Sequence, residues 1–501
     1  MSEFPPSGTS HSEPQPSSPE PAGWQPPEAP RPATGWQPEQ PVGFPAAGDP
    51  PQVPDEIRLP WWRRWKRALT LGGAIAFFAL AAIGMLGYLG YNLGIQALLV
   101  GLAASILPVP VLVACFLWLD RYEPEPTWAL LVCFAWGAVI ATAIALLVNT
   151  VSSKIFQANG LSDGLVAVVV APFIEELSKA AAPLLILWFR RKEISGITDG
   201  IVYCGLAATG FAMTENILYL GGHAYAAGNE QYGVSTGLQL LFATFLVRVL
   251  FSAFAHPLFT SMTGVGIGIA ARAANPVVRW LAPIAGLLLA MMLHGTWNLI
   301  PTLAASTGQT ILVLYGYFAL EVPIFLAMVG FALWLRSHEG RITVRALPAY
   351  VRAGWFSPPE VAALASLGRR HAARTWAKRV AGDPGRKAMG AFQFAATRLA
   401  LVRDGIDRGL NQTPVQLAKA KDEEQALLEQ IAAARQVFVG RDPQTPPALW
   451  TGVAYEMTFP DGQARTVAAP PEPVVPIPVL MPPPPPPAWG YPPAPSWPVR
   501  R

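Results

Sequence analysis

Charged residues are scarce in this sequence. Asp, Glu, Lys and Arg make up 14% of its 501 residues, whereas hydrophobic residues make up 52% and the mean hydropathy is +0.33. Soluble globular proteins carry about 25% charged residues. The composition therefore argues against a soluble enzyme and favours a membrane protein. The formal net charge of +4 is small, so it gives no indication of a nucleic-acid partner.

Cysteine is also scarce. Cys115, Cys133 and Cys204 all fall within apolar stretches, and their spacing matches neither a disulfide framework nor a zinc knuckle. We expect them to be packing residues. The HExxH motif of zinc proteases does not occur in the sequence.

The 52 prolines are concentrated at the two ends of the chain. Residues 1–57 contain too few apolar residues to build a core, so we predict a disordered arm without a cleavable signal peptide. Residues 441–501 form a second Pro-rich segment, with a short hairpin expected around residues 460–462. Polyproline tails of this kind are typical binding sites for cytoplasmic partners.

Long apolar runs fill the region between the two ends. Each is sufficient for the roughly 20 helical residues that cross a lipid bilayer, and only helices satisfy the backbone of such segments internally. We therefore predict an all-α, polytopic membrane bundle within residues 58–340, followed by a small cytoplasmic helical region at residues 341–440. About eight spans are expected, at residues 69–91, 95–119, 128–149, 164–189, 200–221, 238–263, 281–300 and 311–335.

The orientation of the bundle follows from the basic residues of its loops. With the stretch RLPWWRRWKR in the cytoplasm, the loop residues Arg121, Arg272 and Arg336 lie on the same side, together with RRK at residues 190–192. Lys154 is then the only Lys or Arg residue in the loops on the opposite side of the membrane. This asymmetry predicts a multi-pass plasma-membrane protein with both termini in the cytoplasm.

Several ionisable residues lie inside the predicted spans, where each costs on the order of 3 kcal/mol to insert. Glu175 and Lys179 are four residues apart on one helix and can pair, whereas Glu176 points about 100° away from Glu175. Polar residues can simply hold helices together. Paired glutamates and an HxxxN motif favour a functional site instead. The set comprises Glu175, Glu176, Lys179, Glu215, Arg248, His256, His294, Asn298 and Glu321.

In these residues the sequence resembles the PrsW family of intramembrane proteases, which is related to the type II CAAX prenyl endopeptidases. The similarity spans most of residues 115–300. It rests on DRYEPEP at 120–126, EELSK at 175–179, an FxxxE motif ending at Glu215, HPLFT at 256–260 and HGTWN at 294–298. Each motif is weak alone, but together, in this order and on separate spans, they are specific.

The resemblance implies a catalytic set of Glu175, Glu176, Glu215, His294 and Asn298. Glu175 would activate the attacking water with support from Glu176, and Asn298 would stabilise the oxyanion. CAAX enzymes have histidine where this chain has Glu215, so roles transfer to Glu215 least directly. The implied activity is hydrolysis of a peptide bond in a membrane-embedded or membrane-proximal protein, such as an anti-sigma factor.

Charge balance favours a divalent metal, Zn²⁺ in the first instance. Three glutamates would place three negative charges in a low-dielectric region, and a metal held by Glu175, Glu215, His294 and His256 would offset them. Such an ion supplies Lewis-acid activation of water and of the scissile carbonyl. The metal-free alternative keeps one glutamate protonated by burial.

Two other functions are compatible with buried carboxylates. A proton- or cation-coupled transporter would also place them near the membrane midplane, although the charged motifs show no inverted repeat. A catalytically silent scaffold that recruits partners through its Pro-rich tails does not explain the paired glutamates.

Overall fold

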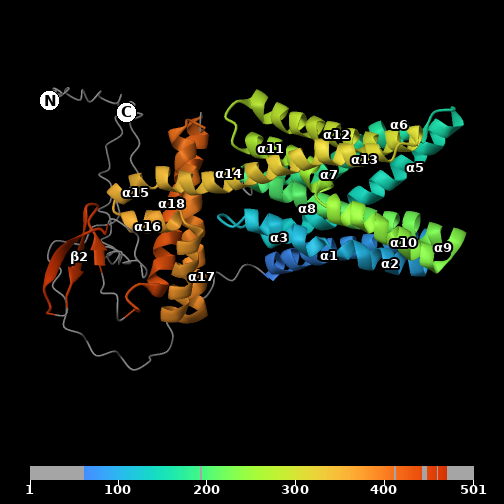
Figure 1. Ribbon diagram of the computed structural model, residues 1–501. Helices are drawn as coiled ribbons and strands as arrows, with labels where there is room; N and C mark the ends of the chain where they lie inside the picture. Colours follow the sequence, from blue (N-terminus) through green and yellow to red (C-terminus); the bar gives the residue numbers. More distant parts are fainter. Residues whose placement is uncertain (1–60, 192–193, 411–412, 443–447, 460, 471–501) are drawn as a thin grey trace, which may run out of the picture.

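The computed structural model describes residues 61–191, 194–410, 413–442, 448–459 and 461–470 (Figure 1). A bundle of long helices forms one part, and a smaller helical domain lies against one end of it. The predicted N-terminal arm and the polyproline stretch of the tail lie outside the described residues. The bundle consists of α1 (Trp61–Leu93), α2 (Ile95–Ile106), α3 (Val109–Leu119), α4 (Thr127–Ala135), η1 (Trp136–Ala141), α5 (Thr142–Ala158), α6 (Asp163–Leu165), η2 (Val166–Val170), α7 (Ala171–Phe189), α8 (Ile197–Asn216), η4 (Ile217–Ala226), α9 (Ala227–Tyr232), α10 (Val234–Phe245), η5 (Leu246–Phe251), α11 (Ala255–Ala271), α12 (Pro276–Thr307), α13 (Ile311–Gly316), η6 (Tyr317–Glu321) and α14 (Val322–Ala346), where η marks π-helical segments.

The described residues contain 7 helical segments that are long and apolar enough to cross a membrane. They coincide with all the predicted spans except residues 164–189. That stretch is helical as well, through α6, η2 and α7, but Glu175, Glu176 and Lys179 give it more charge than an ordinary lipid-facing span carries. The chain is thus a multi-pass helical membrane protein. The helix α7 differs from the other long helices because three of its charged side chains are buried within the bundle.

The helix α8 lies at the centre of the bundle, with buried side chains along almost its whole length. It packs so closely on α11 that a Cβ atom on Gly200 would lie 2.0 Å from the carbonyl oxygen of Gly264. Any larger residue would therefore separate the two helices. Small residues at helix crossings are the usual means of close packing in membranes. This contact fixes α8, which carries Glu215, against α11, which carries His256.

A C-terminal helical domain follows the bundle. It contains α15 (Pro348–Arg352), α16 (Pro358–Leu364), α17 (Leu367–Asp407) and α18 (Pro414–Phe438), and α17 and α18 run across the end of the bundle (Figure 1). Its core includes the buried aromatic residues Tyr350, Trp376 and Phe438. The helix α14 continues from the bundle into this domain and connects the two parts.

A small antiparallel sheet follows α18. It has the strand order β1-β2-β3, formed by β1 (Ala448–Trp450), β2 (Ala454–Thr458) and β3 (Ala464–Ala468). Residue Thr458 pairs with Ala464, so β2 and β3 form a hairpin where the sequence indicated one. The core of the sheet is Trp450 packed on Tyr455.

The loop with the sequence DRYEPEP, residues 120–126, contacts the helical domain directly. The Tyr122 hydroxyl donates to the Ala365 carbonyl at 2.8 Å, and Arg370 donates to the Tyr122 carbonyl at 3.1 Å. Arg398 forms an ion pair with Glu123 at 3.0 Å. This loop is therefore a docking element between the two parts as well as a tight connection between α3 and α4.

The three cysteines are free thiols. Cys133 and Cys204 are buried, as expected for packing residues, but Cys115 is exposed on α3. The expectation was wrong for Cys115 because an apolar stretch in a membrane helix can face lipid as readily as it faces the protein core.

Candidate active site

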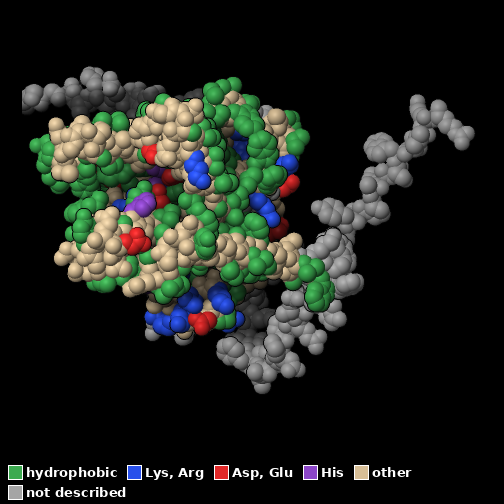
Figure 2. All heavy atoms as spheres, turned by 90° about the vertical axis from the view of Figure 1, so that its right-hand side faces the viewer, with side chains coloured by type: hydrophobic (Ala, Val, Ile, Leu, Met, Phe, Trp, Pro, Cys, Tyr) green, Lys and Arg blue, Asp and Glu red, His purple; other side chains and the backbone are tan. Residues whose placement is uncertain are grey.

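A cavity of about 770 Å³ lies within the bundle and is lined by residues of α5, α7, α8, α11 and α12. Its lining includes Lys154 and Gln157 in the last turns of α5 and Asp163 at the start of α6. Figure 1 shows α6 at the end of the bundle away from the helical domain. Figure 2 shows that end as a hollowed face in which histidine and acidic side chains are visible. The cavity therefore brings water-accessible space to ionisable groups inside an otherwise apolar bundle.

Glu175 lies on the wall of this cavity and is 5% exposed. Its carboxylate accepts hydrogen bonds from Asn149 Nδ2 at 3.3 Å and from Lys179 Nζ at 3.4 Å. The Nε2 atom of His294 lies 3.8 Å from Glu175 Oε2. Glu175 is thus held by two donors and still faces open space, which is the arrangement that a general base requires.

The neighbouring Glu176 is fully buried and points away from the cavity towards α11 and α12. Its Oε2 accepts from the Thr260 hydroxyl at 2.7 Å, and its Oε1 lies 2.9 Å from His294 Nδ1. An ionised carboxylate only accepts hydrogen bonds, so His294 carries its proton on Nδ1. The lone pair of His294 Nε2 is then directed at Glu175. Glu176 therefore orients His294. The two glutamates face different neighbours, as their 100° separation indicated.

Lys179 connects both glutamates to a second histidine. Its fully buried ammonium group lies 2.9 Å from Glu176 Oε1 and 3.0 Å from His256 Nδ1, in addition to its contact with Glu175. It also lies over the ring of Phe211, 4.0 Å from the ring centroid. All three N–H donors of Lys179 are therefore used. Phe211, the first residue of the FxxxE motif, supplies the aromatic face that helps to hold this cation.

Glu215 lies on the other side of His256. Its Oε2 is 2.9 Å from His256 Nε2 and is also paired with Arg248. Arg248 stacks on Tyr219 at 3.5 Å. If Lys179 donates to Nδ1 of His256, the Nε2–H of the same ring donates to Glu215. Lys179 and His256 together therefore connect Glu175 and Glu176 to Glu215. Arg248 is therefore an ion-pair partner of Glu215.

Asn298 lines the cavity one helical turn after His294. One of its amide N–H groups donates to the Ala167 carbonyl at 2.9 Å, which leaves a second N–H for a ligand. Asn149 and Thr260 were not identified from the sequence as site residues. A polar residue within an apolar span was the only available signal for Asn149, and nothing in its spacing pointed to Glu175.

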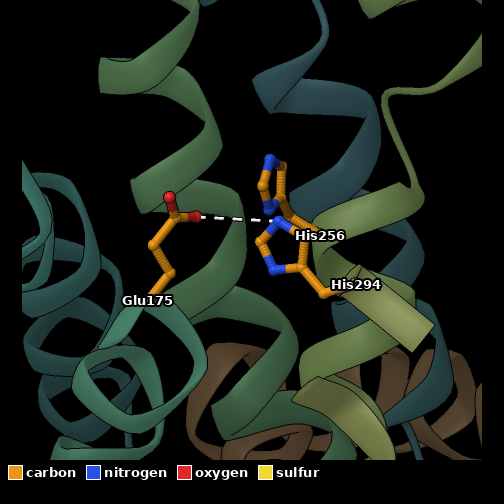
Figure 3. Close-up of side chains that lie close together, drawn as sticks. All are labelled: Glu175, His256 and His294. Carbon is orange, nitrogen blue, oxygen red and sulfur yellow. Dashed lines mark ion pairs between the residues drawn. The ribbon is translucent and has the colours of Figure 1, made fainter. Parts of the chain in front are cut away.

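The ligand atoms of Glu175, His256 and His294 lie within 4.8 Å of one another (Figure 3). One carboxylate and two imidazoles form a common donor set of hydrolytic zinc sites. The Nδ1 atom of His294 is held by Glu176, which is the second contact that metal-binding histidines usually make. These residues fit a divalent cation, with Glu175 and His294 as its primary ligands. His256 would join them by giving up its contact with Lys179 or Glu215, and Glu215 is not part of this set.

Two other polar groups of the region are not part of this site. Glu321 is buried on η6 and does not line the cavity. Residues 160–164, GLSDG, have the spacing of a serine-hydrolase nucleophile motif, but Ser162 caps α6 by accepting a hydrogen bond from the Gly164 amide. The described residues around Glu175 thus provide acids, bases and amides rather than an activated serine.

A second group of carboxylates lies at the opposite end of the bundle. Asp120, Glu125 and Asp199 are all buried, with ligand atoms within 4.8 Å of one another. Burial raises the pKa of Asp120 to about 9, although the amide of Glu125 acts against this shift, and burial raises the pKa of Glu125 to about 11. Tyr203 donates a hydrogen bond to Glu125. Asp120 and Glu125 are therefore neutral carboxylic acids near pH 7.

This second group predicts a pH dependence of stability. A carboxyl group whose pKa is raised by folding contributes stability that is present below its unfolded pKa and lost as the pH rises through its folded pKa. We expect the melting temperature of Asp120→Asn, which cannot ionise, to exceed that of the wild type by an increasing margin as the pH rises from about 4 to about 9. Thermal melts of the purified protein across this range measure the difference. Asp422→Asn, at an exposed position of α18, is the control. A difference in melting temperature that does not change with pH would contradict the prediction.

Residues 125–334 match the family described as PrsW family intramembrane metalloprotease. This segment contains all the cavity residues discussed above, from Asn149 to Asn298. The resemblance noted from the motifs is confirmed by this match.

Curated relatives are similar over the same part of the chain. Protease PrsW of Oceanobacillus iheyensis is 28% identical over 199 residues, which cover 40% of this chain and 81% of the relative. Protease PrsW of Bacillus subtilis is 28% identical over 230 residues, covering 46% and 91%, respectively. The corresponding protein of Clostridioides difficile is 28% identical over 212 residues, covering 41% and 82%. No solved structure matches the chain.

Proposed function

We propose that this chain is an intramembrane endopeptidase that hydrolyses a peptide bond in a membrane-embedded or membrane-proximal protein. The observation that carries the proposal is the pair formed by Glu175 and His294 at 3.8 Å on the wall of a cavity inside the bundle. The relatives named Protease PrsW support the same activity. We place the protein in the plasma membrane with both termini in the cytoplasm, because the basic loops then lie inside.

The residues of the cavity have different roles in hydrolysis. Glu175 accepts a proton as the oxygen of water attacks the scissile carbonyl carbon, and it returns that proton to the nitrogen when the C–N bond breaks. Asn149 and Lys179 hold the carboxylate in place. The free N–H of Asn298 donates to the oxygen of the tetrahedral intermediate. Glu176 fixes the orientation of His294, and Glu215 with Arg248 fixes His256.

Glu175 and His294 would hold a divalent metal, which we propose to be Zn²⁺, with His256 as the third ligand. When bound, it supplies Lewis-acid activation of water and of the scissile carbonyl. Glu176 has a further role with respect to this ion, because its contact with Nδ1 keeps the Nε2 lone pair of His294 available.

The substrate reaches the site from the end of the bundle that is away from the helical domain. The cavity is open there, and polar residues line its mouth. A single-pass membrane protein, with an extended segment close to the membrane surface, fits such an opening. An anti-sigma factor is the substrate class that we propose first.

Comparison of membrane-protein fragments in cells that express the wild type or Glu175→Gln tests this function. We expect a defined set of fragments that is present only with the wild type. An identical fragment pattern in both strains would argue against proteolysis. Ion-dependent uptake by proteoliposomes without cleavage of any membrane protein would instead identify a transporter.

A further inference from the structure

A second cavity, of about 430 Å³, lies between the bundle and the C-terminal helical domain. We call it the junction cavity. It is bordered by the end of α11, the start of α8, the middle of α14 and the end of α17, and it is separate from the cavity that contains Glu175. The proposed peptidase function uses none of its residues.

One side of the junction cavity is basic. Asp404 of α17 is 3% exposed and accepts from Arg272 at 2.6 Å and from Arg408 at 3.4 Å. Arg345 of α14 is a third partner of the same carboxylate. Three guanidinium groups thus share one negative charge. Arg272 and Arg408 line the cavity, so their remaining N–H donors are available to an anion there.

The other side of the cavity is acidic. Glu123 and Glu339 both contribute to its lining. Glu123 is paired with Arg398 at 3.0 Å, whereas Glu339 accepts a hydrogen bond from the uncharged hydroxyl of Thr198. A ligand with a positive group would therefore find an acceptor in Glu339. The cavity combines a place for an anion with a place for a cation.

The outer wall of the cavity is apolar and open to the lipid side. Ile269, Val278 and Trp334 line it and are 38%, 40% and 49% exposed, respectively. They belong to three helical segments that are long and apolar enough to cross the membrane, and they line the part of these segments that borders the junction cavity. Tryptophan at this level is typical of the membrane interface. A ligand with hydrocarbon chains could therefore lie against these residues while its polar part enters the cavity.

We propose that the junction cavity binds the headgroup of an aminophospholipid of the phosphatidylethanolamine type. Its phosphate is bound by Arg272 and Arg408, its primary ammonium group by Glu339, and its acyl chains lie along Ile269, Val278 and Trp334. Arginine suits this role because its planar fork donates two hydrogen bonds to a phosphate group. The bound lipid connects α11 and α14 of the bundle with α17, and so holds the helical domain against the membrane surface.

The test uses the purified full-length protein in detergent. Its melting temperature is followed by tryptophan fluorescence while phosphatidylethanolamine, phosphatidylglycerol, phosphatidylcholine or inorganic phosphate is added in separate titrations. We expect phosphatidylethanolamine to raise the melting temperature at the lowest concentration. Inorganic phosphate lacks the acyl chains, phosphatidylglycerol lacks the ammonium group, and the ammonium group of phosphatidylcholine has no N–H donors. An equal effect of any of these three compounds would therefore overturn the proposal.

Variants locate the effect in the cavity. Arg408→Gln leaves Arg272 and Arg345 on Asp404, so the fold is kept, and we expect phosphatidylethanolamine to bind about fivefold more weakly. Glu339→Gln should abolish the preference over phosphatidylglycerol while retaining the hydrogen bond from Thr198. Arg386→Gln, on an exposed part of α17, is the matched control and should bind like the wild type. Unchanged lipid binding in both Arg408→Gln and Glu339→Gln would overturn the assignment.

Discussion

The variant Glu175→Gln is expected to lower the rate of peptide cleavage by about two to four orders of magnitude, the usual contribution of a positioned base. Glutamine retains the size of the side chain, and its single amide oxygen can replace one of the two carboxylate oxygens that accept from Asn149 and Lys179, but it cannot accept a proton from water. The same loss is expected for Glu215→Gln and His294→Ala. Initial rates on a membrane-anchored reporter protein in proteoliposomes measure the effect.

The matched control for this prediction is Glu321→Gln. Glu321 is also a buried glutamate of the bundle, at 6% exposure, but it lies outside the cavity. We expect its replacement to leave the rate within about threefold of the wild type, because it removes no reacting group. Equal losses in Glu175→Gln and Glu321→Gln would attribute the effect to general disturbance of the bundle. Near wild-type cleavage by Glu175→Gln would show that the base lies elsewhere.

Removal of a bound metal is expected to have an effect of similar size. The purified, active protein should contain about one divalent ion per chain, and chelation should abolish cleavage until the ion is restored. Elemental analysis of the wild type and of His294→Ala measures the stoichiometry independently of activity. We expect the variant to lose most of the ion, because the Nε2 atom of His294 is a primary ligand of the proposed metal site.

The second group of carboxylates provides the control for the metal experiment. Asp120, Glu125 and Asp199 are as close together as the residues around Glu175, but they include no imidazole. Asp120→Asn should therefore retain the ion. Loss of the ion in Asp120→Asn, but not in His294→Ala, would show that the metal binds at the second group of carboxylates and not beside Glu175. Full activity at a metal content far below one ion per chain would leave Glu175 as a base that acts without a metal.

Much of this architecture could be predicted from the sequence. Apolar runs of sufficient length determine where helices cross the membrane, because the unsatisfied backbone of any other structure is too costly in lipid. Spacing along a single helix is equally informative. Glu175 and Lys179 are four residues apart and contact each other at 3.4 Å, and Glu176 points to a different neighbour, as the helical period requires.

Contacts between helices could only be seen in the tertiary structure. A helical period determines which residues share a face, but it does not determine how that face is rotated relative to other helices. The contacts of Asn149 with Glu175, of Thr260 with Glu176 and of His256 with Glu215 therefore had no signal in the spacing. The position of α17 across the end of the bundle depends in the same way on packing between distant segments.

The sequence by itself thus determined the membrane-spanning architecture and the residues of the central motifs, since both depend on local helical geometry and on the cost of burying charge. The tertiary structure decided which nitrogen of His294 faces Glu175 and which cations offset the three glutamates. It also brought Arg272, Arg345 and Arg408 together around Asp404. The physical reason is that hydrogen bonds and ion pairs between helices require side chains from distant parts of the chain to meet within about 3 Å.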